Sequence, residues 1–458
     1  MITRDEIEVK GQEFDIQTSN VQRDYVFGWL LAGIYAASPL RDSLILKGGN
    51  CLRKAYFQNT RFSSDLDFSV TSNMSEEFLN VELNRVCDFV QEHSGVTFDK
   101  DRNKVEEKSN SDNERKIYEA RLYFQDFYDN PHTITISIRL DVTLFDRIYL
   151  PVQRRFLIHP YSDADTCKVE LVCHKLEELL AAKLKCLLQR RHSFDLYDYV
   201  YSIFINRDIE VNRSEILTAF LKKTIFERSP GVAKALLLEL PFEFFKGVWN
   251  KYIVCPKQSL IDFETAISSF RNGIEALFER FQVDYYGRIA FFPAALRNII
   301  LDAGSNFNLL EIVYDHHRRI VEPYALTFKI RKSDGFGQEY FFAYDRTGGQ
   351  SSGPGIKTFL HTKITDIKAT NERFEPRFPV ELSKAGEFGG RTYFGSPFPT
   401  VATTRRPPIR RRQTRRIYMV ECSYCGKRFP RARYSTRLRR HKDKYGNQCY
   451  GRSGYIAY

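Results

Sequence analysis

The sequence predicts a mixed α/β (α+β) chain of several domains, and three observations support this fold class. A length of 458 residues exceeds what one hydrophobic core usually serves, which favours about three domains. Residues 44–70 change from an apolar run to helical spacing and then to the alternation of a strand. Short alternating runs between residues 309 and 364 are separated by turn residues, which is typical of a small barrel or sandwich.

Composition narrows the class of protein. Hydrophobic residues make up 43% of the chain, and no run approaches the roughly 18 apolar residues of a membrane span. The polar start lacks the apolar core of a signal peptide, and most of the nine cysteines are scattered, so we expect reduced thiols and a cytoplasmic protein. The net charge is +12, but residues 400–458 hold 17 Lys and Arg against two acids. Their +15 leaves −3 for the rest, so we expect nucleic-acid affinity in this tail first.

A glycine turn and an acidic pair stand close together near the start of the chain. The turn is Lys47-Gly48-Gly49-Asn50, preceded by an apolar run at residues 44–46, and the pair lies in Asp65-Leu66-Asp67-Phe68. We expect strands at both runs, with a helix at residues 51–59 between them. Because alternate residues of a strand share a face about 6.6 Å apart, Asp65 and Asp67 should project together.

Two carboxylates on one face raise one another's pKa unless a cation lies between them. Mg²⁺ suits such a pair because it takes oxygen ligands and bridges to substrate phosphates. Paired glycines let the backbone approach a phosphate without a Cβ in the way. The alternative is a turn followed by an edge strand with solvated acids. The residues that we predict to bind a nucleoside triphosphate here are Lys47, Gly48, Gly49, Arg61, Ser63 and Ser64.

A later predicted strand also carries an acid on its polar face. The spacing predicts helices at residues 22–37 and 76–92. An exposed loop is expected at residues 100–116, followed by strands at residues 117–128 and 133–143. Asp141 lies on the polar face at the end of the last strand. Asp146 is the other candidate for the same position, although it follows the end of the alternating pattern. A solvated strand end is the alternative interpretation of Asp141.

Residues 170–202 add basic groups at helical spacing. Lys183 and Arg190 are seven residues apart and share a side that faces away from the leucines of this segment. A cation pair facing metal-bound carboxylates would offset the negative charge of a triphosphate and of its transition state. The alternative is an ordinary surface helix with basic residues.

Together these motifs resemble the polymerase-beta-like nucleotidyltransferase superfamily, and most closely its AbiEii/AbiGii toxin family. The family signature is a Lys-Gly-Gly turn, a helix, and an Arg-x-Ser-x-Asp-Leu-Asp-Phe string, which here runs from Arg61 to Phe68. Its later segment is matched by Lys183, Arg190, Asp195 and Asp198. Phe194, with Arg191 nearby, stands where the family has an arginine. The resemblance covers roughly residues 20–210 and also implies that Asp141 is the third carboxylate.

The resemblance implies a Mg²⁺-dependent toxin that transfers a nucleoside monophosphate from an NTP to RNA. Asp65 and Asp67 would bind the metals, Asp141 would help to activate the attacking hydroxyl, and Lys183 would supply a catalytic cation. Arg190, Asp195 and Asp198 would contact the nucleotide. The expected acceptor is tRNA, and the expected context is a bacterial toxin–antitoxin or phage-defence pair with a cognate antitoxin. A nucleic-acid-binding sensor with the transferase fold as a scaffold is the alternative, and protein is a third possible acceptor.

The second half of the chain carries two further expected modules after a nucleotidyltransferase domain at residues 1–210 and a helical domain at residues 211–300. The strands of residues 301–385 resemble a WYL domain, an SH3-like β-barrel of bacterial regulators and nucleic-acid enzymes. This resemblance implies nucleic-acid contacts by Arg319, Tyr340, Lys357 and Lys363. The alternative is a purely structural barrel. Residues 374–408 have the composition of a linker. We expect the basic linker that precedes the last module to span residues 386–416.

Residues 417–458 carry a two-residue knuckle, Cys422-Ser423-Tyr424-Cys425, followed by His441 and Cys449. Thiolate and imidazole ligands suit a structural, tetrahedral Zn²⁺ ion, and few apolar residues remain to fold the segment unaided. The opening resembles a two-Cys, two-His finger, although the span is longer and the last ligand is Cys. A redox-active pair is the alternative, but the flanking βαβ pattern is missing. The arginines predicted to contact phosphates are Arg431, Arg433, Arg437, Arg439 and Arg440.

Overall fold

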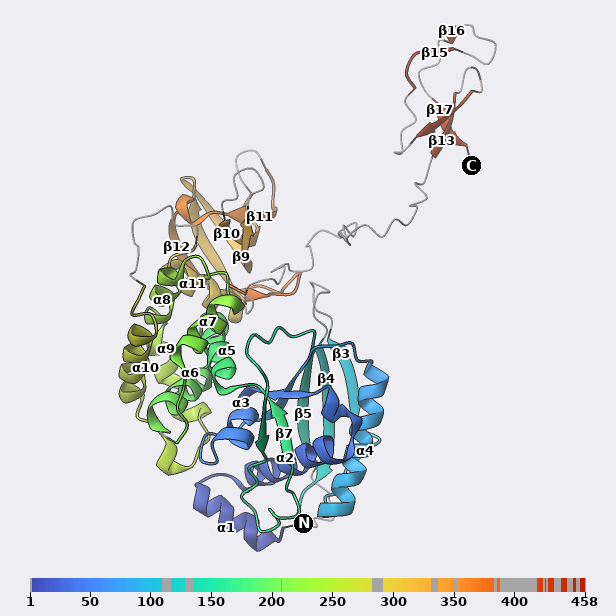
Figure 1. Ribbon diagram of the computed structural model, residues 1–458. Coiled ribbons are helices and arrows are strands. Elements are labelled where there is room, and N and C mark those ends of the chain that lie inside the picture. Colours follow the sequence, from blue (N-terminus) through green and yellow to red (C-terminus); the bar gives the residue numbers. More distant parts are fainter. Residues whose placement is uncertain are drawn as a thin grey trace. The chain divides into compact units, whose positions relative to one another are not determined.

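The computed structural model divides the chain into two compact units, Met1–Phe398 and Pro399–Tyr458, each of which is described by itself (Figure 1). In the first unit the structure describes residues 2–108, 117–127, 135–206, 208–281, 291–330, 337–348, 352–382 and 385–387. In the second unit it describes residues 418–422, 425, 427–431, 438–442, 448–449 and 454–457.

A seven-stranded mixed sheet forms the N-terminal part of the first unit, in the order β3-β4-β5-β2-β1-β7-β6. Its strands are β1 Ile45–Lys47, β2 Asp65–Val70, β3 Lys104–Lys108, β4 Ile117–Gln125, β5 Thr135–Leu144, β6 Gln153–Phe156 and β7 Glu170–Cys173. Strand β2 runs parallel to β5 and antiparallel to β1. In this register Asp67 lies opposite Asp141 on one side and Lys47 on the other.

One predicted loop is wrong. Part of the expected exposed loop at residues 100–116 is strand β3, which pairs with β4 through all five of its residues. The sequence of this edge strand has no apolar alternation, because four of its five residues are charged and exposed and only Val105 enters the core. Residues 109–116, and residues 128–134 where the two predicted strands meet, lie outside the described residues.

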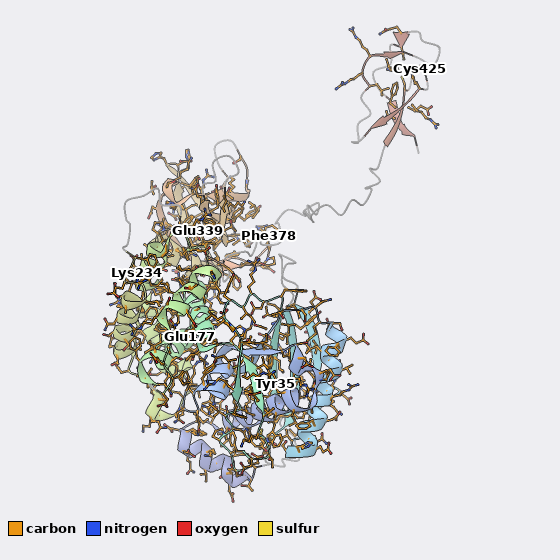
Figure 2. All side chains as sticks on the ribbon, in the orientation of Figure 1. Tyr35, Glu177, Lys234, Glu339, Phe378 and Cys425 are labelled. Atoms are coloured by element: carbon orange, nitrogen blue, oxygen red, sulfur yellow. The ribbon has the colours of Figure 1, made fainter. Side chains whose placement is uncertain are left out.

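Helices α2 Thr18–Ala37 and α4 Glu76–Ser94 lie beside each other against this sheet, and α1 Arg4–Phe14 precedes them (Figure 1). Most of α2 is buried, including Tyr35, which is labelled in Figure 2. The Tyr35 hydroxyl lies 3.0 Å from the carbonyl oxygen of Leu44 and 2.9 Å from that of Val172, within hydrogen-bonding distance of both. The short helix α3 Gly48–Cys51 continues as a π-helical turn, Leu52–Tyr56, between β1 and β2. This turn replaces the longer helix expected at residues 51–59.

Residues 170–202 form a strand, two helices and the start of a π-helical turn, Tyr201–Ile205. After β7 come α5 Leu176–Gln189 and α6 Ser193–Val200, and Arg191 between them adopts a left-handed φ of 51°. Arg190 therefore lies just beyond the end of α5. The helices that follow are α7 Arg213–Lys223, α8 Pro230–Leu238, α9 Phe242–Tyr252, α10 Phe263–Leu277 and α11 Ala294–Ser305. Helices α7 to α10 share one continuous hydrophobic core with the seven-stranded sheet.

A second, five-stranded antiparallel sheet has the order β11-β10-β9-β8-β12. Its strands are β8 Asn308–Tyr314, β9 His317–Ile330, β10 Gly337–Asp345, β11 Gly355–Phe359 and β12 Ile364–Arg373. Helix α11 packs against it. The first residues of the expected linker belong to the folded unit. Phe374, Leu382 and Ala385 are buried, and Glu387 forms an ion pair with Lys185.

The second unit holds a three-stranded sheet, β14-β13-β17, and a two-stranded one, β15-β16. Their bounds are β13 Tyr418–Cys422, β14 Arg428–Arg431, β15 His441–Lys442, β16 Gln448–Cys449 and β17 Gly454–Ala457. In the part of the chain that the structure describes, no helix is long and apolar enough to cross a membrane.

Candidate active site

Three carboxylates converge on one face of the first sheet, on its central strands β2 and β5. Asp65 and Asp67 lie on β2, and Asp141 lies on the parallel neighbour β5, directly opposite Asp67. One oxygen from each carboxylate lies within 4.8 Å of the other two. The parallel register produces this convergence, because residues that face each other on neighbouring strands project to the same side of the sheet.

The electrostatics of this cluster favour a bound cation. Burial, together with the charges of Asp65 and Asp141, raises the pKa of Asp67 to about 6. Burial is also the main cause of the raised pKa of Asp141, whose Oδ1 atom is buried without a hydrogen-bond partner among the described residues. A divalent cation with oxygen ligands would relieve the repulsion and give this oxygen a partner. The residues present therefore fit Mg²⁺.

Arg139 is a member of the site that our motif analysis did not single out. Its guanidinium contacts the Asp65 carboxylate, and its Nη2 atom lies 3.4 Å from Asp141 Oδ2. The side chain is 44% exposed, so it can move without opening the core. The signal was present in the sequence, since Arg139 and Asp141 are two residues apart on one strand and share its polar face.

The two glycines are required by how closely side chains of the site approach them. Gly48 has a φ of 75°, and a Cβ there would lie 2.1 Å from Asp67 Oδ2. A Cβ on Gly49 would lie 2.7 Å from Ser63 Oγ, which itself donates to Asp65 Oδ1 at 3.3 Å. The glycine turn thus lies directly against Asp67 and Ser63. Ser64 is exposed.

Lys47 does not point into open space. Its Nζ donates to Asp146 Oδ2 at 2.8 Å and to Thr143 Oγ1 at 3.0 Å. Asp146 also accepts from Ser69 Oγ, and although burial opposes it, the Lys47 charge holds the pKa of Asp146 far below its usual range. The rival acid is therefore the fixed partner of Lys47. The same lysine charge acts to lower the pKa of Asp67.

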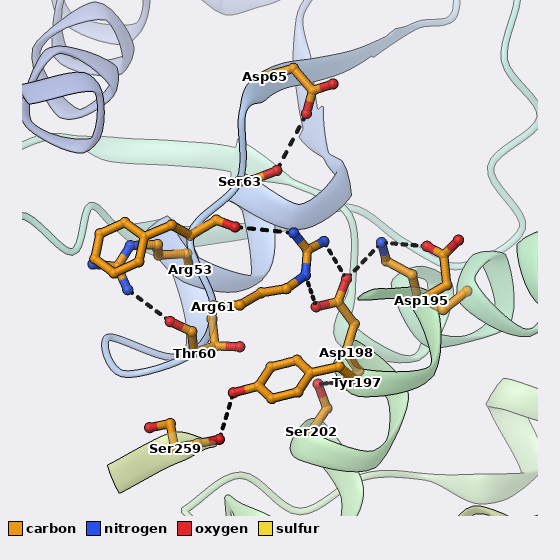
Figure 3. A network of polar contacts seen from close by, with 12 residues as sticks. Arg53, Thr60, Arg61, Ser63, Asp65, Asp195, Tyr197, Asp198, Ser202 and Ser259 are labelled. Carbon is orange, nitrogen blue, oxygen red and sulfur yellow. Dashed lines mark hydrogen bonds and ion pairs between the residues drawn. The ribbon is translucent and has the colours of Figure 1, made fainter. Parts of the chain in front are cut away.

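Five of the predicted site residues pair with one another in a buried ion cluster beside the carboxylates. Arg61 donates from Nε and Nη2 to both oxygens of Asp198, each at 2.7 Å, an arrangement that Figure 3 shows from close by. Lys183 Nζ lies 3.0 Å from Asp195 Oδ1 and 2.7 Å from Asp198 Oδ2. Arg190 donates from Nε and Nη2 to Asp195, each at 2.9 Å.

This cluster changes the interpretation of Lys183. Burial alone would lower its pKa, but the charges of Asp198 and Asp195 raise it, so the lysine stays protonated. Its side chain is only 7% exposed, and it joins α5 to α6 rather than standing free beside the three acids. The side chain of Arg190 is 41% exposed, although the charge of Asp195 also holds it. Arg190 is therefore the cation of this cluster with the most contact with solvent.

Phe194, at the position where the family signature has arginine, supplies an aromatic face to the same cluster. The guanidinium carbons of Arg61 and Arg190 lie 4.8 Å and 5.4 Å from its ring centroid. Cation–π contacts of this kind hold guanidinium groups in place. Arg191 does not replace the missing arginine, because its guanidinium contacts Asp302 and Asn298 of α11.

The candidate nucleic-acid contacts of the second sheet are also paired. Arg319 Nη1 and Lys357 Nζ donate to the buried Asp345 at 2.7 Å and 2.8 Å, and Lys363 donates to Asp315 at 2.8 Å. Tyr340 is half-buried. Arg319 and Lys357 thus brace the sheet, and a role in nucleic-acid binding stays a prediction for this set.

In the second unit, the four predicted zinc ligands come together. One ligand atom from each of Cys422, Cys425, His441 and Cys449 lies within 4.8 Å of the other three. Arg439 and Arg440 are exposed close to them. The side chain of Arg431 is not among the described ones, and Arg433 and Arg437 lie outside the described residues.

Comparison with known proteins identifies part of the chain. Residues 29–253 match the model of the family described as nucleotidyl transferase AbiEii toxin, Type IV TA system. A search of curated proteins finds no match. Among solved structures, MenT4, a nucleotidyltransferase toxin from Mycobacterium tuberculosis H37Rv, shares 16% identity with a TM-score of 0.38, over 61% of this chain and 91% of that one. The family match, rather than this structural likeness, is the basis for describing residues 29–253 as a nucleotidyltransferase toxin domain.

Proposed function

We propose that the chain transfers a nucleoside monophosphate from an NTP to RNA, on the basis of its AbiEii nucleotidyltransferase toxin domain at residues 29–253. The observation that carries this proposal is the carboxylate cluster on β2 and β5. Three acids hold oxygens within 4.8 Å of one another, and repulsion within the cluster contributes to raising the pKa of Asp67 to about 6. Such a cluster costs stability unless it binds cations, which is what phosphoryl transfer requires.

Asp65 and Asp67 would hold Mg²⁺ together with Asp141, whose buried Oδ1 lacks a hydrogen-bond partner among the described residues. When bound, Mg²⁺ would neutralise triphosphate charge and favour deprotonation of the attacking hydroxyl. Arg139 would leave Asp65 and Asp141 as the cation binds, and its guanidinium would then be available to a phosphate. Because Gly48 lies tightly against Asp67 and has no side chain, the space beside the β2 carboxylates would stay open.

The basic residues of the site divide into two roles. Lys183 and Arg61 would act as positioning residues, because they are buried and hold Asp195 and Asp198 in place. Arg190 would contact the triphosphate, because its side chain is 41% exposed and its charge interacts with that of Asp67. Ser63 and Gly49 would complete the phosphate contacts, since Ser63 lies beside Asp65 and Gly49 lies against Ser63.

The acceptor that we propose is a folded RNA, with tRNA as the first candidate. The support is the charge of residues 400–458, where 17 Lys and Arg stand against two acids. A basic tail of this kind binds phosphate backbones without reading sequence, which suits an RNA recognised by shape. The family description, a Type IV TA system, suggests an antitoxin partner. We propose that the two form a bacterial toxin–antitoxin or phage-defence pair.

The test is incubation of the full chain with each labelled NTP, Mg²⁺ and total RNA, followed by sequencing of the labelled species. We expect label in tRNA with the wild type and none with Asp65→Ala. The control is Asp42→Ala, which changes an exposed acid outside the carboxylate cluster. Equal labelling by wild type and Asp65→Ala would refute the assignment of the site. Label in another RNA, or in protein, would refute the acceptor while leaving the site intact.

A second candidate is a nucleic-acid-binding regulator of the WYL type, favoured by the five-stranded sheet β8 to β12. A regulator that uses the transferase fold as a scaffold would not need the acids. Induction in a bacterial host separates the two functions. Growth arrest that Asp67→Ala abolishes supports the transferase, whereas arrest that this variant retains supports the regulator.

A further inference from the structure

We propose that the second unit, Pro399–Tyr458, holds one structural Zn²⁺ ion between Cys422, Cys425, His441 and Cys449. The distances between the ligand atoms match a tetrahedral site. With Zn–S bonds of about 2.3 Å and Zn–N bonds of about 2.0–2.1 Å, tetrahedral angles require sulfurs about 3.8 Å apart and sulfur about 3.5 Å from nitrogen. Cys422 Sγ lies 3.8 Å from Cys449 Sγ, and Cys425 Sγ lies 3.4 Å from His441 Nε2.

The backbone presents these ligands from two separate turns. Cys422 ends β13, and its N–H donates to the carbonyl of Lys427 at 2.9 Å, which closes the knuckle that carries Cys425. His441 and Cys449 lie directly opposite each other in the pair β15–β16. Neither turn alone brings together more than two ligands. A metal ion would therefore tie the three-stranded and the two-stranded sheets of this unit together.

The histidine is oriented for coordination through Nε2. Its Nδ1 lies 2.9 Å from the carbonyl oxygen of Arg439, which accepts only if Nδ1 carries the proton. The Nε2 lone pair is then free to face Cys425. Metal-binding histidines commonly donate their other ring N–H to a carbonyl in this way, which fixes both the tautomer and the ring. The Phe429 ring packs against the imidazole, with a centroid distance of 4.7 Å.

The donor set selects zinc over the alternatives. Thiolate and imidazole ligands favour Zn²⁺ and disfavour Mg²⁺, so this site differs in kind from the carboxylate cluster of the first unit. A disulfide would bring two sulfurs to about 2.05 Å, well below the 3.8 Å between Cys422 and Cys449. Four protein ligands leave no open position for a substrate, so the role of the ion is structural.

The hydrophobic core of this unit is small. Its buried members among the described residues are Val420, Leu438 and two of the ligands, Cys422 and Cys449. A segment of this size usually needs a metal or disulfides to fold, because apolar burial does not offset its conformational entropy. We therefore expect the unit to be ordered only with zinc bound.

The experiment measures the metal content of the full chain, purified without chelator, by inductively coupled plasma mass spectrometry. We expect one Zn²⁺ per chain in the wild type and loss of that zinc in Cys425→Ser. The matched control is Cys186→Ser, which changes a half-buried cysteine of α5 and should retain the ion. Asp67→Asn should retain it as well, and this arm separates the zinc site from the carboxylate site.

A second measurement on the wild type does not depend on how a variant folds. Replacement by Co²⁺ should produce the strong visible absorption of a tetrahedral thiolate complex, and removal of the metal should make the second unit sensitive to protease while residues 1–398 stay intact. A wild type without zinc and without this absorption would overturn the proposal. So would a Cys422–Cys449 disulfide in the native protein, or full zinc content in Cys425→Ser. None of these results depends on nucleotide transfer, so they leave the proposed function untouched.

Discussion

Replacing Asp67 with asparagine should stabilise the metal-free protein while it abolishes catalysis. Burial and the charges of Asp65 and Asp141 raise the pKa of this carboxyl from 3.8 to about 6. A shift of that size corresponds to about 3 kcal/mol of destabilisation at neutral pH. Because Asp67 is only half-buried, solvent screens part of this energy, and we expect Asp67→Asn to gain about 1–3 kcal/mol. Asparagine keeps the shape of the side chain, so the gain comes from the removed charge.

The pH dependence of this gain has a definite sign. Below about pH 6 the Asp67 carboxyl is neutral in the folded protein, but in the unfolded chain it stays charged until about pH 3.8. Lowering the pH from 7.5 to 4 therefore stabilises the wild type relative to the variant, and the difference between them should shrink towards zero. Mn²⁺ or Mg²⁺ should stabilise the wild type and have little effect on the variant, because the carboxylate that binds the cation is missing.

The assay is urea unfolding in EDTA at pH 7.5, 5 and 4, repeated at pH 7.5 with metal. Asp42→Asn serves as the control, because Asp42 is exposed and its removal should leave every midpoint unchanged. A less stable Asp67→Asn at pH 7.5, with a difference that does not change between pH 7.5 and pH 4, would refute the argument from carboxylate repulsion.

Three further predictions concern the residues around the carboxylates. Lys183→Met should lower the free energy of unfolding by about 1.5–3 kcal/mol, because the buried Asp195 and Asp198 each lose one of two cationic partners, whereas Lys246→Met, at an exposed ion pair, should leave the unfolding midpoint unchanged. Gly48→Ala should cost about 100-fold in the rate of transfer, because its Cβ would displace Asp67, while Gly247→Ala in α9 meets no neighbour and should stabilise by about 0.5–1 kcal/mol. Arg139→Gln should lower the Mg²⁺ concentration needed for half-maximal binding, since the arginine then no longer competes for Asp65; an unchanged or higher concentration would contradict this.

The sequence was most informative where local pattern and chemistry coincide. Alternation along residues 65–70 and 135–144 is enough to place Asp65, Asp67 and Asp141 on polar faces, and the parallel pairing of β2 with β5 then brings them together. Pairing between distant strands cannot be read from a local period, so the approach of the acids was an expectation drawn from family resemblance. Strand β3 was missed for a related reason, since an edge strand with four exposed charged residues has no apolar alternation.

Ion pairing between helices was the least predictable feature. Lys183 and Arg190 are seven residues apart, and a continuous helix would have placed both on one open side. The chain instead breaks at Arg191, and α6 folds back so that Asp195 and Asp198 meet these cations. A left-handed φ at an arginine carries no clear signal in the sequence, because glycine or asparagine usually occupies that conformation. The identity of the cluster residues was thus predicted, but their mutual pairing was not.

The most direct test of the central claim is a crystal structure of the full chain with Mn²⁺ and a non-hydrolysable NTP, with manganese located by anomalous scattering. Our account predicts manganese bound by oxygens of Asp65, Asp67 and Asp141, with Arg139 displaced from them and the triphosphate beside Gly49 and Ser63. Manganese bound elsewhere in the first unit, with Arg139 still paired to Asp65, would contradict the claim that these three acids form the catalytic metal site.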